Sequence, residues 1–249
     1  NSFKGMVDRC ADCGFDLAGG RVEVVPTAHY MMGGVVFDGD CRTSLPGLFA
    51  AGEDTGGVHG ANRLGGNGVA NSTVYGGIAG DAMAMWVRKD GHWHAPDEAL
   101  IQQQVGAHDA PLQRKHSSTE PLREALYDLM WNDAGILRTK VGLQRAQSEL
   151  LALSEEIERV GVSADDRAFN LSWHDWLDLR SLIRVSQAIT TAALAREDSR
   201  GAHFREDFPL TGELETSRYT VVRKRGEALE LTEQPVAFTR VRPGETLIT

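Results

Sequence analysis

Residues 59–80 read HGANRLGGNGVANSTVYGGIAG, and we expect the rest of the chain to be arranged around this stretch. It begins as a glycine-rich loop with one arginine, Arg63, and continues into a segment that predicts a helix beginning near Asn67. The first backbone amides of a helix have no partners inside it, and the aligned peptide dipoles place about half a positive charge at that end. Glycines also let the backbone approach a ligand closely. The stretch therefore predicts an anion site at the start of a helix.

Small side chains fill much of this predicted helix. Glycine costs a helix roughly 1 kcal/mol relative to alanine, so several glycines indicate that a neighbour needs the space. We expect the helix to pack tightly against a sheet or a flat cofactor through Gly68, Ala70, Ser72, Gly76, Gly77, Ala79 and Gly80.

The composition is that of a globular protein. The chain has 249 residues and a formal net charge of -9, and it holds no apolar run long enough to span a bilayer. An acidic balance argues against a nucleic-acid surface, which needs clustered Lys and Arg. Three cysteines make no disulfide framework. We therefore expect a soluble protein in a reducing cytoplasm, without a nucleic-acid partner.

No metal site is predicted. Cys10 and Cys13 form a CxxC pair, but no second pair completes a zinc site. We interpret them as two residues of one amphipathic helix, with a metal or redox role as the alternative. His92 and His94 lie in a polar turn and have no third ligand nearby.

Short strands are predicted before the glycine-rich loop. Residues 21–25 form a β-branched run that ends at a proline. Residues 35–37 favour a strand, residues 38–40 a tight turn, and residues 48–51 a buried strand that ends just before Glu53. A strand, a glycine-rich loop and a helix in this order are typical of the cofactor crevice of an α/β sheet.

Four motifs carry a resemblance to a known family. PTAHYMMGG, LPGLFAAGE, VHGANRLGGN and DSRGAHFREDFP follow one another in the chain. In this order they are similar to motifs of the flavoprotein subunits of succinate dehydrogenase and fumarate reductase, and of L-aspartate oxidase. The resemblance covers about residues 24–209. It implies an FAD-dependent oxidoreductase that exchanges a hydride between flavin N5 and a four-carbon dicarboxylate.

The resemblance also implies roles for single residues. His29 and Arg63 match the family's ligands for the substrate carboxylates, and Glu53 matches a residue that holds hydroxyl groups of FAD. Gly68 and Val69 stand where the family usually has Ser-Leu, which removes a hydroxyl and keeps the backbone amides. The expected cofactor contacts are Glu53, His59, Asn67, Gly68 and Val69.

Residue chemistry supports the carboxylate ligands and also offers plainer alternatives. The planar fork of arginine grips a carboxylate through two parallel hydrogen bonds, and imidazole can donate to a carboxylate. On chain chemistry alone, His29 is a structural residue at a strand edge, Arg63 caps loop carbonyls, and Glu53 pairs with Arg63.

Two features of the family do not occur in this sequence. One is the strand, GxGxxG turn and helix that bind the FAD pyrophosphate. The other is the arginine of the capping domain that is thought to deliver a proton during fumarate reduction, so no catalytic residue is predicted. We expect a carboxyl-terminal part of a flavoprotein of roughly twice this length. We also expect the isolated chain to be catalytically inactive and to bind FAD weakly or not at all.

Three helices are predicted after a polar linker that contains Gly91. They cover Pro121 to Arg138, Lys140 to Val160 and Trp173 to Arg196, with apolar residues at helical spacing and short connections. They predict an antiparallel bundle. The charged loop of residues 198–209 follows, either as a docking loop near the active site or as a salt-bridged loop that caps the bundle.

The predicted fold class is α/β. We expect a partial FAD-binding Rossmann-like domain with a remnant of the capping domain, followed by a three-helix bundle and a short β tail, which forms a small sheet or an extended arm. The predicted segments are residues 1–25 as the capping remnant, 26–90 as the FAD-binding part, 91–210 as the bundle and 211–249 as the tail.

Three hypotheses for function follow. The first is a fragment of a succinate or fumarate flavoprotein, which the resemblance pairs with an iron-sulfur subunit, a dicarboxylate substrate and a peripheral place on the inner face of the membrane. The second is the equivalent part of L-aspartate oxidase, which works without an iron-sulfur partner. The third is a non-catalytic interaction module.

Overall fold

The computed structural model describes residues 3–23, 29–92, 95–226 and 228–246. The chain forms two compact units, residues 1–31 and 32–249, and each is described by itself. The four segments predicted from the sequence divide the chain differently, and that finer division stays a prediction.

The first unit contains helix α1, which spans Lys4–Asp12. An ion pair between Lys4 and Asp8, one turn apart, supports it at 2.7 Å. The predicted amphipathic helix is confirmed, with Cys10 inside it and Cys13 at its C-cap. The strand predicted at residues 21–25 falls mainly on residues 24–28, which lie outside the described residues.

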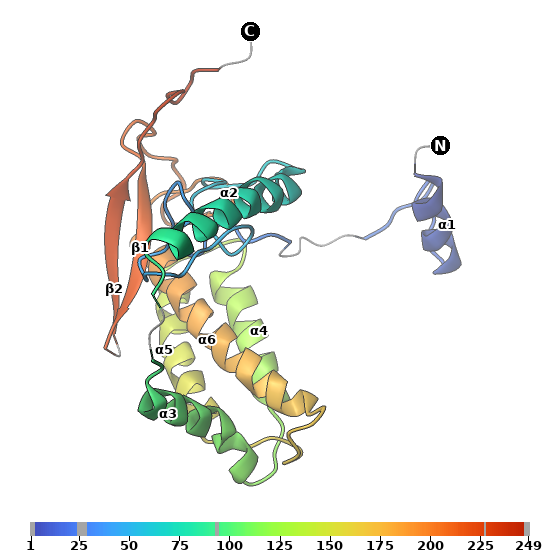
Figure 1. Cartoon of the computed structure of the whole chain (residues 1–249). Helices are drawn as coiled ribbons and strands as arrows, with labels where there is room; N and C mark the ends of the chain where they lie inside the picture. Colours follow the sequence, from blue (N-terminus) through green and yellow to red (C-terminus); the bar gives the residue numbers. More distant parts are fainter. Residues whose placement is uncertain (1–2, 24–28, 93–94, 227, 247–249) are drawn as a thin grey trace. The chain divides into compact units, whose positions relative to one another are not determined.

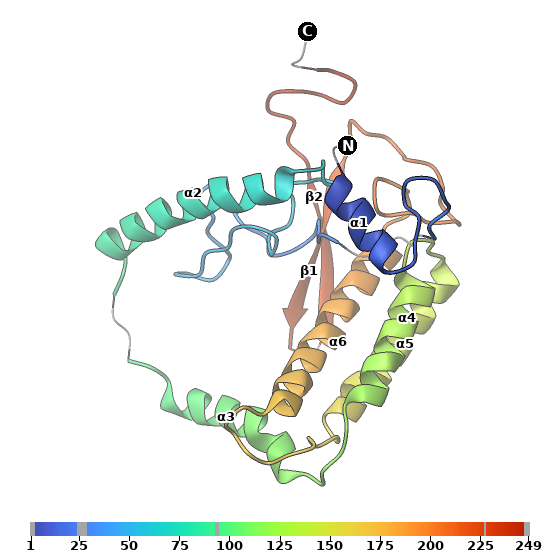
Figure 2. The same cartoon turned by 90° about the vertical axis from the view of Figure 1, so that its right-hand side faces the viewer.

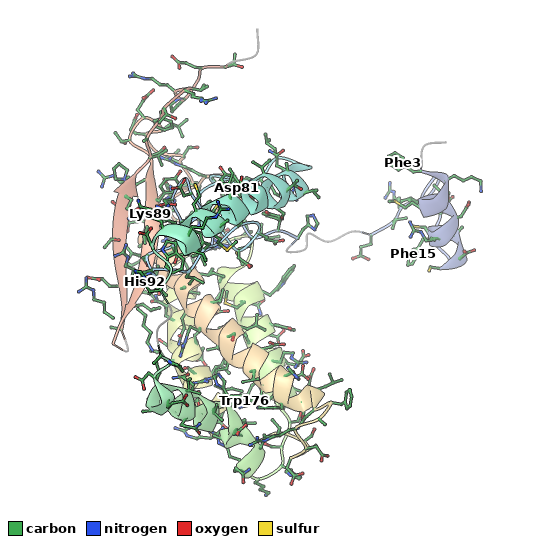
Figure 3. The ribbon with its side chains drawn as sticks, viewed as in Figure 1. Phe3, Phe15, Asp81, Lys89, His92 and Trp176 are labelled. Carbon is green, nitrogen blue, oxygen red and sulfur yellow. The ribbon has the colours of Figure 1, made fainter. Side chains whose placement is uncertain are left out.

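Helix α2 spans Asn67–Lys89 and packs one stripe of side chains on the segment that precedes it. Figure 3 shows Asp81 and Lys89 along the same helix. The stripe meets residues 37–55 through hydrogen bonds and edge-to-face aromatic pairs with Phe37 and Phe49. Its members recur every three or four residues, at Asn71, Tyr75, Ala79, Ala82 and Trp86.

Gly76, Gly77 and Gly80 lie on a different face of α2 from the side chains that pack on residues 37–55. A side chain added at Gly76, Gly77 or Gly80 would meet nothing within 4 Å. The expected tight packing through these glycines is therefore absent within the described residues of this chain, because Asn71 and the aromatic residues make the contacts instead.

The strands predicted at residues 35–37 and 48–51 are wrong as strands. Val35 forms a single bridge with Thr55, and Phe49 forms another with Arg42. A strand requires a continuous hydrogen-bonded neighbour, and each of these segments finds only one paired residue among the described residues.

Three helices form the bundle, as predicted. Helices α4 (Glu120–Ala134), α5 (Lys140–Ile157) and α6 (Leu171–Ala195) run antiparallel in sequence order, and α5 packs against both of the others (Figure 1). The side chain of Thr139 caps the start of α5, and that of Asn170 caps the start of α6.

The core of the bundle is apolar and centres on Trp176, a fully buried residue of α6 that Figure 3 labels. The indole nitrogen of Trp176 donates to the carbonyl of Ile157 at 2.9 Å. Leu179 and Ile183 occupy buried positions of α6, whereas Leu182 is 42% exposed. The buried cluster comprises Leu112, Leu126, Leu150, Ile157, Val162, Trp176, Leu179 and Ile183.

A helix that the sequence analysis did not predict lies at the amino-terminal end of α6. Helix α3 spans Glu98–Asp109 and continues into the short 3-10 helix η1, Ala110–Gln113. Trp173 donates to the carbonyl of His108 at 2.8 Å and fixes α3 beside the start of α6. In Figure 2, α2 lies near the opposite end of α6.

The tail forms an antiparallel hairpin, which confirms the small sheet. Strand β1, Arg218–Arg225, pairs with β2, Ala228–Pro235, and both lie beside α6. Gly226, with a φ of 59°, follows β1 at the turn.

A buried arginine joins the ends of two bundle helices. The Arg205 side chain is fully buried, and its Nη1 donates to the carbonyls of Ala193, Leu194 and Arg196 at 3.0–3.1 Å. Its other nitrogens grip Asp207, which also accepts from the backbone N–H of Lys140 at 2.8 Å. A cation at the carboxyl end of α6 and an anion at the amino end of α5 both complement the helix dipoles.

The Arg205 hydrogen bonds lower the pKa of Asp207 to about 2 from a usual value of 3.8. Because the folded-state pKa is depressed, ionised Asp207 contributes stability that is fully present above the ordinary pKa. This contribution is lost as pH falls from 3.8 to about 2. The loop of residues 198–209 is therefore, in part, the salt-bridged cap that was one of its two predicted roles.

Arg205→Met is expected to lower the free energy of unfolding of the chain by about 3 kcal/mol, because it orphans three helix carbonyls and a carboxylate that is bound on both sides. Urea unfolding at neutral pH measures this loss. The matched control is Arg225→Met, which removes an ion pair to Glu230 from an arginine that is 75% exposed; its cost should stay below about 1 kcal/mol. Equal losses in the two variants would contradict this assignment.

Candidate functional site

The start of α2 has open space beside it and no side-chain cap among the described residues. Its N-cap, Gly66, has a φ of 86°, and no side chain caps the helix among the described residues. A Cβ added at Gly65 or Gly66 would meet nothing within 4 Å. Open space thus lies beside the first amides of the helix, where a polar or anionic group is stabilised.

Arg63 lies in the loop immediately before this helix start. Its side chain is half-buried, and its Nη1 donates to the carbonyl of Leu64 at 3.3 Å. The predicted alternative, in which Arg63 holds a loop carbonyl, is thus realised through one guanidinium nitrogen. A guanidinium has five N–H donors, and the forked grip on a carboxylate needs two of them.

Asn71 ties the loop to the preceding segment, although the sequence patterns did not single it out. The residue is buried, and its Nδ2 donates to the carbonyl of Gly52 at 3.1 Å and lies 3.2 Å from Nε2 of His59. The hydroxyl of Thr55 donates to the same carbonyl at 2.7 Å. The arrangement holds His59 beside the first turn of α2, with Nε2 as the acceptor. The sequence feature that could have identified Asn71 is its amide side chain, which lies one helical turn after Asn67.

The second glycine of the HYMMGG motif, Gly34, has a steric basis. The backbone N–H of Val35 donates to the carbonyl of Asp54 at 2.7 Å, and the N–H of Gly56 donates to the carbonyl of Val35 at 3.1 Å. A Cβ at Gly34 would lie 2.6 Å from the carbonyl carbon of Asp54. Only glycine permits this approach, which fixes the turn that contains Glu53.

The other predicted site residues differ in exposure. His29 is exposed and belongs to the first unit, so it is described with that unit alone. Val69 is 77% exposed, and Gly68 is half-buried. Glu53 and Asn67 are exposed. The structure thus brings His59, Arg63, Asn67, Gly68 and Val69 together on one loop and helix start, and their roles stay predictions.

The charged loop after the bundle meets this site. The backbone N–H of Ala202 donates to the carbonyl of Ala61 at 2.9 Å, two residues before Arg63. The DSRGAHFREDFP motif and the HGANR motif, far apart in sequence, are therefore in direct contact. Docking near the site was one of the two alternatives predicted for this loop.

Within the described part of the chain, no group of three or more His, Cys, Asp or Glu side chains could hold a metal ion. Cys10 and Cys13 are free thiols. His94 lies outside the described residues, and His92 is exposed. The search for a membrane-spanning helix, over the same residues, found none of sufficient length and apolarity.

Two known protein families match this chain, one over its amino-terminal part and the other over its carboxyl-terminal part. Residues 3–69 match the family described as FAD binding domain, which covers the segment up to the start of α2. Residues 123–247 match the family described as fumarate reductase flavoprotein C-term, which covers the bundle, the charged loop and the hairpin.

Several curated proteins are similar in sequence. A fumarate reductase (CoM/CoB) polypeptide of Methanothermobacter marburgensis is 38% identical over 206 residues, which is 83% of this chain and 37% of that protein. L-aspartate oxidase 1 of Ralstonia nicotianae is 37% identical over 84% of this chain and 37% of its own length. The fumarate reductase flavoprotein subunit of Mycobacterium tuberculosis is 34% identical over 90% and 40%. The chain thus spans about two fifths of the length of these relatives.

Solved structures show the same fold. Mycobacterium smegmatis Sdh1 in complex with UQ1 superposes with a TM-score of 0.82 and 31% identity over 94% of this chain and 40% of that chain. A variant of the E. coli quinol fumarate reductase superposes with a TM-score of 0.84 and 29% sequence identity. The match covers 95% of this chain and 41% of that chain. The predicted fold class, part of a flavoprotein with a helical carboxyl-terminal domain, is confirmed.

Proposed function

Because this chain belongs to the FAD-dependent succinate dehydrogenase and fumarate reductase flavoprotein family, we propose that it is the carboxyl-terminal part of an oxidoreductase that interconverts succinate and fumarate. The observation that carries the proposal is the loop of residues 59–66, where Arg63 stands between two glycine-rich runs at an uncapped helix start. A cationic fork beside exposed backbone amides suits an oxygen-rich dicarboxylate next to a flavin.

The residues at the helix start fit the family's cofactor. No side chain among the described residues caps α2, and the space beside Gly65 and Gly66 is open. The amides of Gly68 and Val69 would face the flavin ring, and Glu53 would hold hydroxyl groups of FAD. When bound, FAD supplies hydride transfer to and from a substrate carbon.

Arg63 is proposed to bind one substrate carboxylate through two parallel hydrogen bonds. This grip orients the carbon skeleton, because a bidentate pair fixes both the position and the plane of the carboxylate. Asn71 holds His59 against the first turn of α2 and thereby keeps the loop on the helix. His29 is proposed as a ligand for a substrate carboxylate because it lies in the HYMMGG motif. This assignment rests on the motif and not on a distance to other site residues.

Partners and cellular place are proposed on the same basis. An iron-sulfur subunit that accepts or supplies electrons, and peripheral association with the inner face of a membrane through partner subunits, would accompany a succinate or fumarate enzyme. The isolated chain is proposed to be inactive, because FAD pyrophosphate binding in this family rests on a GxGxxG turn that the 249 residues do not contain.

L-aspartate oxidase activity is the second candidate. The observation that favours it is the 37% identity to L-aspartate oxidase 1 of Ralstonia nicotianae. Aspartate is also a four-carbon dicarboxylate, so Arg63 would serve both substrates alike. Oxygen consumption with L-aspartate by the FAD-loaded flavoprotein separates the candidates, since a succinate or fumarate enzyme should show none above its blank.

Arg63→Gln is expected to raise the dissociation constant for succinate or fumarate roughly 10- to 150-fold in the FAD-loaded flavoprotein, because charge-assisted bonds contribute about 1.5–3 kcal/mol. FAD content should stay near that of the wild type. Steady-state kinetics and flavin absorbance measure the two quantities. Arg88→Gln, at the exposed last turn of the same helix, is the matched control. If both variants bind the dicarboxylate like the wild type, the proposed role of Arg63 is wrong.

A further inference from the structure

Residues 200–203 form a closed tight turn in the charged loop after the bundle. The N–H of Arg200 donates to the carbonyl of His203 at 2.8 Å, and the N–H of His203 donates back to the carbonyl of Arg200 at 2.9 Å. Gly201 and Ala202 therefore stand at the corner of the turn, where their backbone projects away from its two anchored ends.

The corner of this turn is pressed against the loop that carries Arg63. The N–H of Ala202 donates to the carbonyl of Ala61 at 2.9 Å. Gly201 has a φ of 54°, and a Cβ there would lie 2.6 Å from the carbonyl carbon of Ala61 and 2.9 Å from Cβ of Asn62. Both the conformation and the space thus require glycine. Because the neighbour is largely backbone, it cannot move aside cheaply.

One end of the turn is anchored by the side chain of Arg200. Its Nε donates to the carbonyl of Thr211 at 2.7 Å, its Nη1 to the hydroxyl of Ser217 at 2.7 Å, and its Nη2 to the carbonyl of Glu213 at 3.0 Å. An ion pair with Asp198 at 3.0 Å completes the set, and the Arg200 side chain is only 13% exposed. The guanidinium is held through all three of its nitrogens, so this end of the turn has little freedom.

The other end is anchored by His203. Nη1 of Arg138 donates to Nδ1 of His203 at 2.9 Å, and Nε2 of His203 contacts the carbonyl of Arg196 at 3.4 Å. The Nε of Arg138 donates to the carbonyls of Ala134 and Gly135, at the end of α4. Burial, together with the charge of Arg138, lowers the pKa of His203. The imidazole is therefore neutral at pH 7, as an acceptor at Nδ1 requires.

We propose that the turn of residues 200–203 is a positioning element for Arg63, held rigid by the bundle and acting on substrate affinity through the Ala61 and Asn62 backbone. Only Asn62 separates Ala61 from Arg63, so a shift at Ala61 carries directly to the Arg63 backbone. A small displacement of a group that orients a substrate weakens its interaction strongly. This inference rests on the proposed role of Arg63 in carboxylate binding.

Gly201→Ala in the FAD-loaded flavoprotein tests the proposal. The expected result is a KM for the dicarboxylate raised about tenfold, as for partial loss of a charge-assisted bond, with kcat and FAD content close to those of the wild type. Hydrogen exchange of the peptide that contains residues 58–66 should become faster. The matched control is Gly226→Ala, because Gly226 has a φ of 59° and no neighbour within 4 Å of an added Cβ.

A second variant keeps the test decisive if Gly201→Ala folds poorly. His203→Leu removes the acceptor for Arg138 and leaves Gly201 in place; it should raise KM in the same direction, while His203→Asn, which can accept at an amide oxygen, should restore part of the affinity. An unchanged KM in folded Gly201→Ala or His203→Leu protein overturns the proposal, and so does a raised KM without faster exchange at residues 58–66. If the wild-type flavoprotein itself binds no dicarboxylate, the proposed function fails; faster exchange in Gly201→Ala then still supports the contact, and unchanged exchange overturns it.

Discussion

The hydrogen bonds of the buried Arg205 guanidinium join the ends of α5 and α6, and the conformation of the loop of residues 198–209 depends on them. The guanidinium satisfies three carbonyls at the end of α6 and holds Asp207 against the first amide of α5. A fully buried charge is costly unless its donors are used, and here each nitrogen of the guanidinium finds an acceptor. The loop of residues 198–209 thereby takes one fixed shape on the bundle.

Through this loop the bundle contacts the segment that carries the proposed substrate ligand Arg63. The same loop presents the Gly201 corner to Ala61, so rigidity at α5 and α6 reaches the loop that carries Arg63. A glycine-rich loop alone is conformationally free and orders a ligand group only at an entropic cost. The contact between Ala202 and Ala61 restricts the glycine-rich loop in the absence of a ligand. The entropic cost of ordering Arg63 on ligand binding is therefore lower.

Sequence patterns predicted the elements whose partners are near in sequence. The helical spacing of Leu126, Leu150 and Ile157 indicated the bundle, and the alternation around Gly226 indicated the hairpin. The segment at residues 35–37 was misassigned because a strand depends on its hydrogen-bonded neighbour as much as on its own residues. The Ala202 contact joins residues far apart along the chain, so no local pattern encodes it. The roles of the site residues came from motifs and stay predictions.

The proposed function requires above all that a carboxylate bind next to the flavin at the Arg63 loop. The most direct test is the flavin absorbance spectrum of the FAD-loaded flavoprotein that contains this chain, titrated with malonate, a dicarboxylate that cannot undergo the reaction. The expected result is a spectral change that saturates with malonate, because a bound dianion alters the electrostatic environment of the ring. A spectrum that malonate leaves unchanged, in protein that retains its full FAD, would contradict carboxylate binding at this loop.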